Sequence, residues 1–226
     1  AYIAEAKRLQ AIYPEHILVG FETEYCDETS PALINRLRKE AKVDYVVGSV
    51  HHVLGIPFDF SEQRYDEAVQ ECGGLVELFQ QYYEQQLVLI EQCRPEVIGH
   101  FDLIKLYAGS TRGLDLALAQ QVERNIAAVL QYGGVFEVNA RGFGKGLGEP
   151  YPGLALLRRI REMGGVITLG DDSHGVDDIG IDYDQTLACV KEAGFDSLVM
   201  LRRKEGQRRD WARPMAHLEQ VVVPLR

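Results

Sequence analysis

The amino-acid sequence predicts an α/β fold built on parallel strands, either a barrel or an open sheet. Strand-like apolar runs alternate with segments of helical periodicity along most of the chain, and Gly and Pro mark the joins. Repetition of strand and then helix requires crossover connections, which pair the strands in parallel. The 226 residues suit a single domain over 1–226, because α/β barrels of this length form one core.

The predicted strands are short runs of β-branched and other apolar residues at about 17–24, 44–51, 96–101, 135–139, 165–170 and 196–201. The predicted helices carry apolar residues at helical spacing and lie at about 1–13, 30–42, 74–92, 114–131, 152–163 and 183–193. Pro14 ends the first helix, whereas Pro31 and Pro152 stand at the starts of two others. A loop separates the second strand from the long helix. About six strands are visible, fewer than the eight of a regular barrel.

Composition and charge narrow the possible partners. The chain is 46% hydrophobic and 26% charged, as in an ordinary globular domain. Its formal net charge of -10 argues against nucleic acid as a partner, although bound divalent cations would still permit a phosphorylated substrate. The four cysteines form no Cys-x-x-Cys pair and are predicted to be reduced thiols. Without a long apolar run or a basic-then-apolar leader, the chain is predicted to be a cytoplasmic enzyme with no membrane partner.

Four of the predicted strands end or break on side chains that ligate metals. Glu22 lies in the first strand, His51 ends the second, His100 follows the third, and Asp172 and His174 form an Asp-x-His pair after the strand at 165–170. The carboxyl ends of parallel strands share one rim, which is where barrel enzymes hold their active sites. Each piece alone is weak, but the four together predict a polynuclear metal site.

The residues alone leave two of these assignments open. Glu24 points to the same side of an extended strand as Glu22, so spacing does not choose between the two carboxylates. His51 and His52 point to opposite faces, so one could be a ligand while the other faces a helix or solvent. Carboxylates can bridge two cations, and sites of this kind hold metals about 3.5–4 Å apart.

A glycine-rich segment after the strand at 135–139 reaches the same predicted rim. Arg141 offers a fork for a phosphate group, and Lys145 lies among glycines whose N–H groups could face an anion. The segment is not a P-loop, because Gly follows Lys145. Farther on, the basic cluster formed by Arg202, Arg203, Lys204, Arg208 and Arg209 is predicted to be a solvated loop packed down by Trp211.

The ordered combination of motifs resembles the PHP (polymerase and histidinol phosphatase) superfamily, most closely its histidinol-phosphatases of the fungal and monofunctional bacterial type. The resemblance covers nearly the whole chain and rests on the segments 19–25, 44–52, 98–105, 136–139 and 169–174. It implies a distorted (β/α)7 barrel with a cluster of up to three divalent ions of zinc, iron or manganese.

By motif position, the resemblance implies that Glu22 is a bridging carboxylate and that His51 and His100 bind a second metal with it. Asp172 would bind the first metal and His174 the third. The metals would polarise the phosphoryl oxygens and supply the attacking hydroxide, so Glu22, Asp172 and His174 count as catalytic. The implied reaction is hydrolysis of L-histidinol phosphate, a small phosphorylated metabolite, in histidine biosynthesis.

One departure from the superfamily pattern concerns its opening His-x-His, which does not occur in this sequence. No histidine precedes His16, and the first residue is Ala1, so we expect an N-terminally truncated domain that lacks its first strand or strands. His16 would be a structural residue or a remaining upstream ligand. The alternatives are another PHP phosphoesterase, acting on nucleotides, and a non-catalytic metal-binding relic of the fold.

Overall fold

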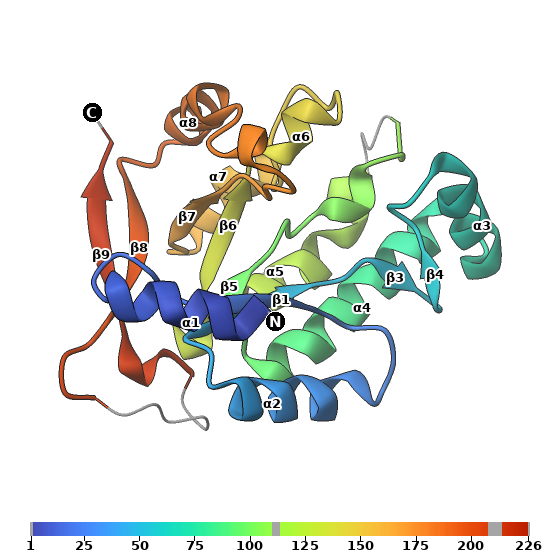
Figure 1. The fold of residues 1–226 in the computed structure, drawn as a ribbon. Coiled ribbons are helices and arrows are strands. Elements are labelled where there is room, and N and C mark those ends of the chain that lie inside the picture. Colours follow the sequence, from blue (N-terminus) through green and yellow to red (C-terminus); the bar gives the residue numbers. More distant parts are fainter. Residues whose placement is uncertain (1, 110–113, 208–213, 226) are drawn as a thin grey trace.

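A parallel sheet forms the centre of the molecule (Figure 1). The computed structural model describes residues 2–109, 114–207 and 214–225. Within them the sheet has the order β1-β2-β5-β6-β7. Its strands are β1 (Gly20–Glu24), β2 (Tyr45–Ser49), β5 (Val97–Ile98), β6 (Val135–Asn139) and β7 (Ile167–Gly170). Every pairing is parallel, which confirms the predicted class and brings all five carboxyl ends to one edge of the sheet.

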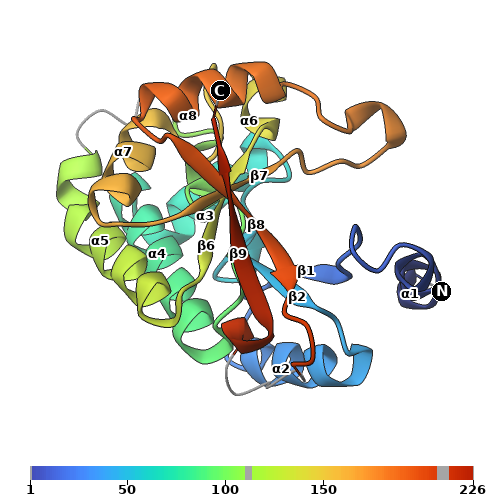
Figure 2. The same cartoon turned by 90° about the vertical axis from the view of Figure 1, so that its left-hand side faces the viewer.

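Helices that follow the strands form an outer layer around the sheet (Figure 2). They are α2 (Ser30–Ala41), α4 (Leu75–Cys93), α5 (Leu114–Tyr132), α7 (Leu154–Glu162) and α8 (Tyr183–Glu192). The first helix, α1 (Tyr2–Ile12), lies instead beside β1, and the Tyr2 hydroxyl donates to the Gly20 carbonyl oxygen at 3.2 Å. The six helices that the sequence predicts are therefore present, with boundaries within a few residues.

The hydrophobic core lies between the sheet and this outer layer. Among its largest fully buried side chains are Phe58, Tyr82, Phe101, Phe136 and Leu78. Phe101 packs against Phe136 with ring centroids 5.7 Å apart, which joins the segment after β5 to β6. Each apolar side chain buried in this way contributes about 1.5–3 kcal/mol, so the core holds the neighbouring strand ends in fixed positions.

At the amino ends of the strands, the buried carboxylate of Asp44 connects distant parts of the chain. It accepts hydrogen bonds from the Val19 N–H at 2.8 Å and from the Gln10 amide at 2.7 Å. The Arg203 guanidinium binds both of its oxygens, at 2.6 and 2.7 Å. The carboxylate thereby holds β1, α1 and the C-terminal part of the chain at one point.

A second buried carboxylate, that of Glu96, does the same just before β5. It accepts from the Val46 N–H at 2.8 Å and from the Arg38 guanidinium at 3.2 Å. The side chains of this ion pair are only 3% and 2% exposed. Arg38 also donates to the Cys93 carbonyl oxygen at 2.9 Å, so the pair joins α2, α4 and β5.

The segment between β2 and α4, which was predicted to be a loop, is structured. It contains a hairpin of β3 (His52–Val53) and β4 (Ile56–Pro57), followed by α3 (Glu62–Cys72). Leu54 and Gly55 form the turn with φ values of 52° and 77°, and the Ser61 hydroxyl accepts from the Arg64 N–H to cap α3. The prediction was wrong because Leu is unusual at a left-handed turn position and the strands have two residues each.

The C-terminal part of the chain also differs from the prediction. The predicted strand at 196–201 is present as β8 (Ser197–Arg203), but it pairs antiparallel with β9 (Leu218–Pro224) and does not continue the parallel order. Part of the supposed solvated tail is thus a strand, and the short helical turn η3 (Pro214–His217) precedes it. The run of valines in β9 supplies the β-branched side chains that favour this pairing.

The basic cluster of the tail is divided between structural contacts. Arg202 binds Glu219 across the β8–β9 hairpin at 2.5 Å, and Lys204 donates to the Ala216 carbonyl oxygen at 3.1 Å. Arg203 binds Asp44, as described above. These three residues are therefore not a solvated loop, whereas Arg208, Arg209 and Trp211 lie outside the described residues.

Short helical turns complete the described chain: η1 (Leu103–Lys105), α6 (Arg141–Gly144) and η2 (Val176–Asp178). All four cysteines are free thiols, in agreement with the prediction. Within the described ranges, no helix combines the length and the apolar character that crossing a membrane requires.

Candidate metal centre

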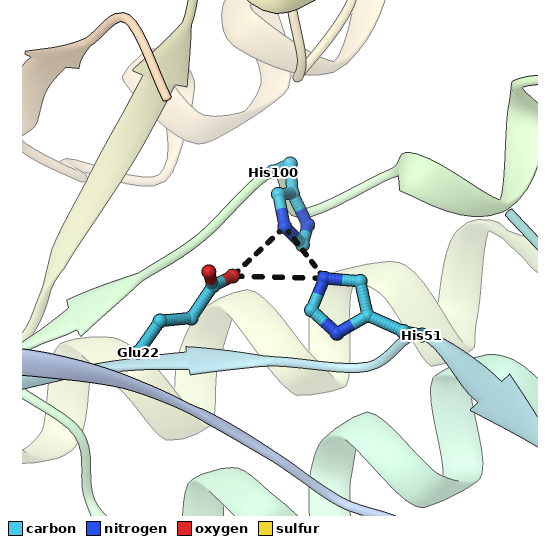
Figure 3. A group of neighbouring side chains, drawn as sticks. All are labelled: Glu22, His51 and His100. Carbon is cyan, nitrogen blue, oxygen red and sulfur yellow. Dashed lines mark hydrogen bonds and ion pairs between the residues drawn. The ribbon is translucent and has the colours of Figure 1, made fainter. Parts of the chain in front are cut away.

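Three of the predicted ligands meet at the carboxyl end of the sheet (Figure 3). Glu22 comes from β1, His51 follows β2 and His100 follows β5. The Nε2 atoms of the two histidines are 3.2 Å apart, and they lie 3.6 Å (His51) and 3.1 Å (His100) from the same Glu22 oxygen, Oε1. The structure therefore brings together one carboxylate and two imidazoles from three adjacent strands.

Close backbone approach behind the centre fixes the Glu22 carboxylate. The Ser49 hydroxyl donates to Glu22 Oε1 at 2.5 Å. A Cβ atom at Gly99 would lie 2.6 Å from the Ser49 oxygen and 2.9 Å from Val47, so glycine is required there for the hydroxyl to reach Glu22. Gly99 thus permits the close approach of the neighbouring Ser49 side chain.

Opposite charges dominate the electrostatics of the centre. Burial lowers the pKa of His100, but the hydrogen bond to Glu22 and the charges of Glu22 and Glu137 outweigh it and raise the pKa to about 9. Burial raises the pKa of Glu22, yet the partnership with His100 and Ser49 lowers it to about 2. Burial and the nearby charge of His100 lower the pKa of His51. At neutral pH the centre therefore contains an ionised Glu22, a protonated His100 and a neutral His51.

Glu137 is a neighbour of the centre that the predicted site residues did not include. Its carboxylate accepts from the His100 N–H at 3.0 Å and from the Asn139 amide at 3.1 Å. Burial is the main cause that raises its pKa. A Cβ at Gly170 would lie 2.0 Å from its Oε1, so β7 leaves room for it only through that glycine. A lone acid inside an apolar strand, Val-Phe-Glu-Val, was the available signal.

The Asp-x-His pair lies at the same edge but does not join the three clustered ligands. Asp172 has a left-handed φ of 51°, and its charge is among those that raise the pKa of His100. The His174 side chain is 68% exposed, and its Nδ1 lies 2.8 Å from the Asp172 carbonyl oxygen. The Asp178 carboxylate accepts from the His174 N–H at 3.0 Å. Local hydrogen bonds within this loop therefore set the position of His174.

The predicted phosphate-binding residues lie on the loop after β6. The Arg141 guanidinium is 3.1 Å from the Asp178 carboxylate, and the Arg141 N–H donates to Asn139 at 2.9 Å. Lys145 is exposed at the end of α6. Arg141 and His174 thus share Asp178 as a partner, which links the two loops beside the centre.

Other candidate ligands fall into a second group next to the first. Glu24, Cys26 and His52 each offer one ligand atom within 4.8 Å of those of the other two. Glu24 Oε1 also lies 3.7 Å from His51 Nδ1, on the side of that ring away from Glu22. His16 is exposed in the turn after α1 and belongs to neither group within the described chain.

Comparison with known proteins identifies a matching family and several relatives. The family model for the PHP domain matches residues 1–141. A protein of Schizosaccharomyces pombe named as a histidinol-phosphatase is 39% identical over 209 residues, which cover 89% of this chain and 68% of that protein. The chain therefore spans about two thirds of the length of this relative.

Solved structures share the fold. One, described as a histidinol phosphatase of Listeria monocytogenes, superposes with a TM-score of 0.72 at 25% identity, covering 81% of this chain and 74% of the other. A histidinol phosphate phosphatase of Lactococcus lactis, solved with zinc, L-histidinol and phosphate, gives a TM-score of 0.64 at 23% identity, covering 88% and 75%. These likenesses support the distorted α/β barrel that the sequence resemblance implied.

Proposed function

The chain belongs to the PHP domain family, and on this basis we propose that it is a metal-dependent histidinol-phosphatase acting through a single domain over 1–226. The reaction is the hydrolysis of a phosphomonoester, L-histidinol phosphate, to L-histidinol and phosphate. The observation that carries the proposal is the convergence of Glu22, His51 and His100 at the carboxyl edge of the sheet. Barrel enzymes hold their chemistry at this edge.

The donor set fits a divalent cation. One carboxylate oxygen and two imidazole nitrogens are ligands that catalytic zinc sites use. Tetrahedral ligands with Zn–N distances of about 2.0–2.1 Å stand about 3.3 Å apart, close to the 3.2 Å between the two Nε2 atoms. When bound, the cation would polarise the phosphoryl group and activate water. Zinc is our first choice, with manganese and iron as alternatives, and a cluster of up to three ions remains part of the proposal.

The side chains around the three donors serve to orient them. The Ser49 hydroxyl holds one Glu22 oxygen, while Glu137 holds the backbone of His100. Donors fixed in this way need little rearrangement when a cation binds, which strengthens binding. We assign Asp172 and His174 to further cations of the cluster, as their motif positions imply.

Phosphate binding falls to the loop after β6 in this proposal. The Arg141 guanidinium can bind two phosphoryl oxygens at once, and its Asp178 partner holds it at the rim until substrate arrives. Lys145 is exposed nearby on the same loop and adds positive charge. In this proposal the substrate is a small phosphorylated metabolite. Its phosphate lies between the metal centre and the positively charged side chains of Arg141 and Lys145.

Phosphate release from L-histidinol phosphate tests the proposal. The whole chain, reloaded with zinc, manganese or iron, is compared with Glu22→Gln and with Glu40→Gln, which removes an exposed carboxylate on α2. We expect turnover in the wild type and in Glu40→Gln and a loss of at least about 100-fold in Glu22→Gln. Equal turnover in Glu22→Gln would remove that residue from the site, and faster hydrolysis of a nucleoside monophosphate would overturn the substrate.

A further inference from the structure

The second group of donors lies beside the proposed phosphatase centre and does not belong to it. Its ligand atoms come from the Glu24 carboxylate at the end of β1, the Cys26 thiol in the following segment and the His52 imidazole at the start of β3. We propose that these three residues bind an additional Zn²⁺. The proposal is independent of phosphatase activity, because it concerns none of Glu22, His51 and His100.

Backbone contacts place Glu24 and Cys26 near each other. Tyr25, between them, is buried, and its N–H donates to the Ser49 carbonyl oxygen at 3.2 Å. Alternation of side chains along extended chain then leaves Glu24 and Cys26 together on the other side. The Ser30 hydroxyl accepts from the Cys26 N–H at 3.1 Å and fixes the chain where it leaves β1.

The two adjacent histidines divide between the two centres. His51 directs Nε2 toward Glu22 and His100, whereas His52 contacts Glu24 Oε1 through Nδ1. The Glu24 carboxylate accordingly lies between the rings, 3.7 Å from His51 Nδ1. His52 is therefore the histidine available to the second group, and Glu24 stands at the boundary between the two centres.

A cavity of about 630 Å³ opens onto the second group, and its lining favours a cation. Besides Cys26 and His52, the lining includes the acids Asp27 and Glu28, and it contains no Lys or Arg among the described residues. Gln85 lines the same cavity, and its buried Oε1 has no hydrogen-bond partner within the described part of the chain. This oxygen is a candidate fourth ligand, directly or through water.

The chemistry of the donors selects zinc among common divalent cations. A thiolate and an imidazole suit a borderline-soft ion, whereas Mg²⁺ and Ca²⁺ prefer oxygen ligands throughout. Binding requires that the Cys26 thiol release its proton to solvent as the sulfur–metal bond forms. An ion held by Cys26 and His52 would join the segment after β1 to the β3–β4 hairpin.

Cobalt tests the site because a Co²⁺–thiolate bond absorbs in the near ultraviolet, whereas cobalt bound only by imidazoles and carboxylates gives no such band. The full chain is titrated with Co²⁺ alone, and bound metal is counted by equilibrium dialysis. The test variants are Cys26→Ser and His52→Gln. The matched control is Cys72→Ser, which alters a half-buried thiol on α3.

We expect the thiolate band in the wild type and in Cys72→Ser. In Cys26→Ser we expect the band to be lost, and the number of bound Co²⁺ ions to fall by one per chain. His52→Gln keeps the thiol but should weaken the titration at this site at least about tenfold. A wild type without the band, or a Cys26→Ser variant that retains it, would overturn the proposal. Phosphate release by the same samples is scored separately, so failure of one proposal does not conceal the fate of the other.

Discussion

The two ends of the parallel sheet use similar residues for opposite purposes. At the amino end, Asp44 and Glu96 are buried carboxylates that meet arginine guanidinium groups and backbone N–H donors. At the carboxyl end, Glu22 faces two imidazoles whose ring nitrogens also face each other. Buried charges are stable where partners neutralise them, whereas a carboxylate and two imidazoles whose ligand atoms converge on one point are typical of a cation site. One end of the sheet is built for stability and the other for ligands.

The largest effect should come from breaking the amino-end pair. Glu96→Gln leaves the Arg38 guanidinium buried without its counter-charge, and we expect a loss of about 3–5 kcal/mol in the free energy of unfolding. Urea unfolding measures it, with the exposed Glu40→Gln as the control, for which about 0.5 kcal/mol or less is expected. If the free energy of unfolding fell equally little in both variants, the buried ion pair at the amino end would not be stabilising the fold.

Zinc should stabilise the folded protein only by binding at the carboxyl end of the sheet. At a concentration about 100 times the Kd of the centre, Zn²⁺ should raise the free energy of unfolding by about 2.7 kcal/mol. Thermal unfolding is measured in a Cys26→Ser background, which removes the proposed second zinc. This gain should appear in Cys26→Ser itself and when Glu96→Gln is added to it, but not when Glu22→Gln is added. A full gain in Glu22→Gln would contradict the assignment of the metal centre.

The affinity of the centre for metal should rise with pH. Glu22 is the main group that raises the pKa of His100 to about 9, and a cation can bind that nitrogen only when it is deprotonated. Below about pH 9 the proton competes with the metal, so the apparent affinity for Zn²⁺ should increase by up to about tenfold per pH unit and then level off. Chelator competition in the Cys26→Ser background measures the slope, and a flat profile between about pH 6 and 8 would contradict it.

The smallest effect should follow from the loop after β7. Asp172→Asn removes one negative charge near His100, and asparagine tolerates the left-handed backbone at this position, so the fold should remain intact. We expect metal binding to weaken about tenfold, as for a ligand outside the preformed cluster. Isothermal titration with zinc reports the change, and unaltered affinity would show that Asp172 does not contact the metal.

Sequence patterns predicted the features that depend on the strands and on the residues at their ends. The parallel strands follow from alternation of elements, and metal ligands at strand ends predicted that carboxylates and histidines meet at one edge. The choice of Glu22 over Glu24, and of His51 over His52, came from the family resemblance and not from spacing. Side-chain placement on loops was not accessible in this way, because the position of His174 depends on a hydrogen bond to Asp178. Glu137 was missed because its contacts depend on the order of the strands. Only the folded sheet places its carboxylate against the His100 backbone N–H on one side and Gly170 on the other.

Strand β1 carries Glu22 and Glu24 on one face, and its register against β2 pairs them with Val47 and Ser49. A slip of one residue would turn both carboxylates to the opposite face of the sheet. The two proposed metal centres would then be lost together, since each takes one ligand from this strand. Metal occupancy of either centre therefore reports whether β1 has paired correctly, and a cation in the refolding buffer should select the native register over its nearest competitor.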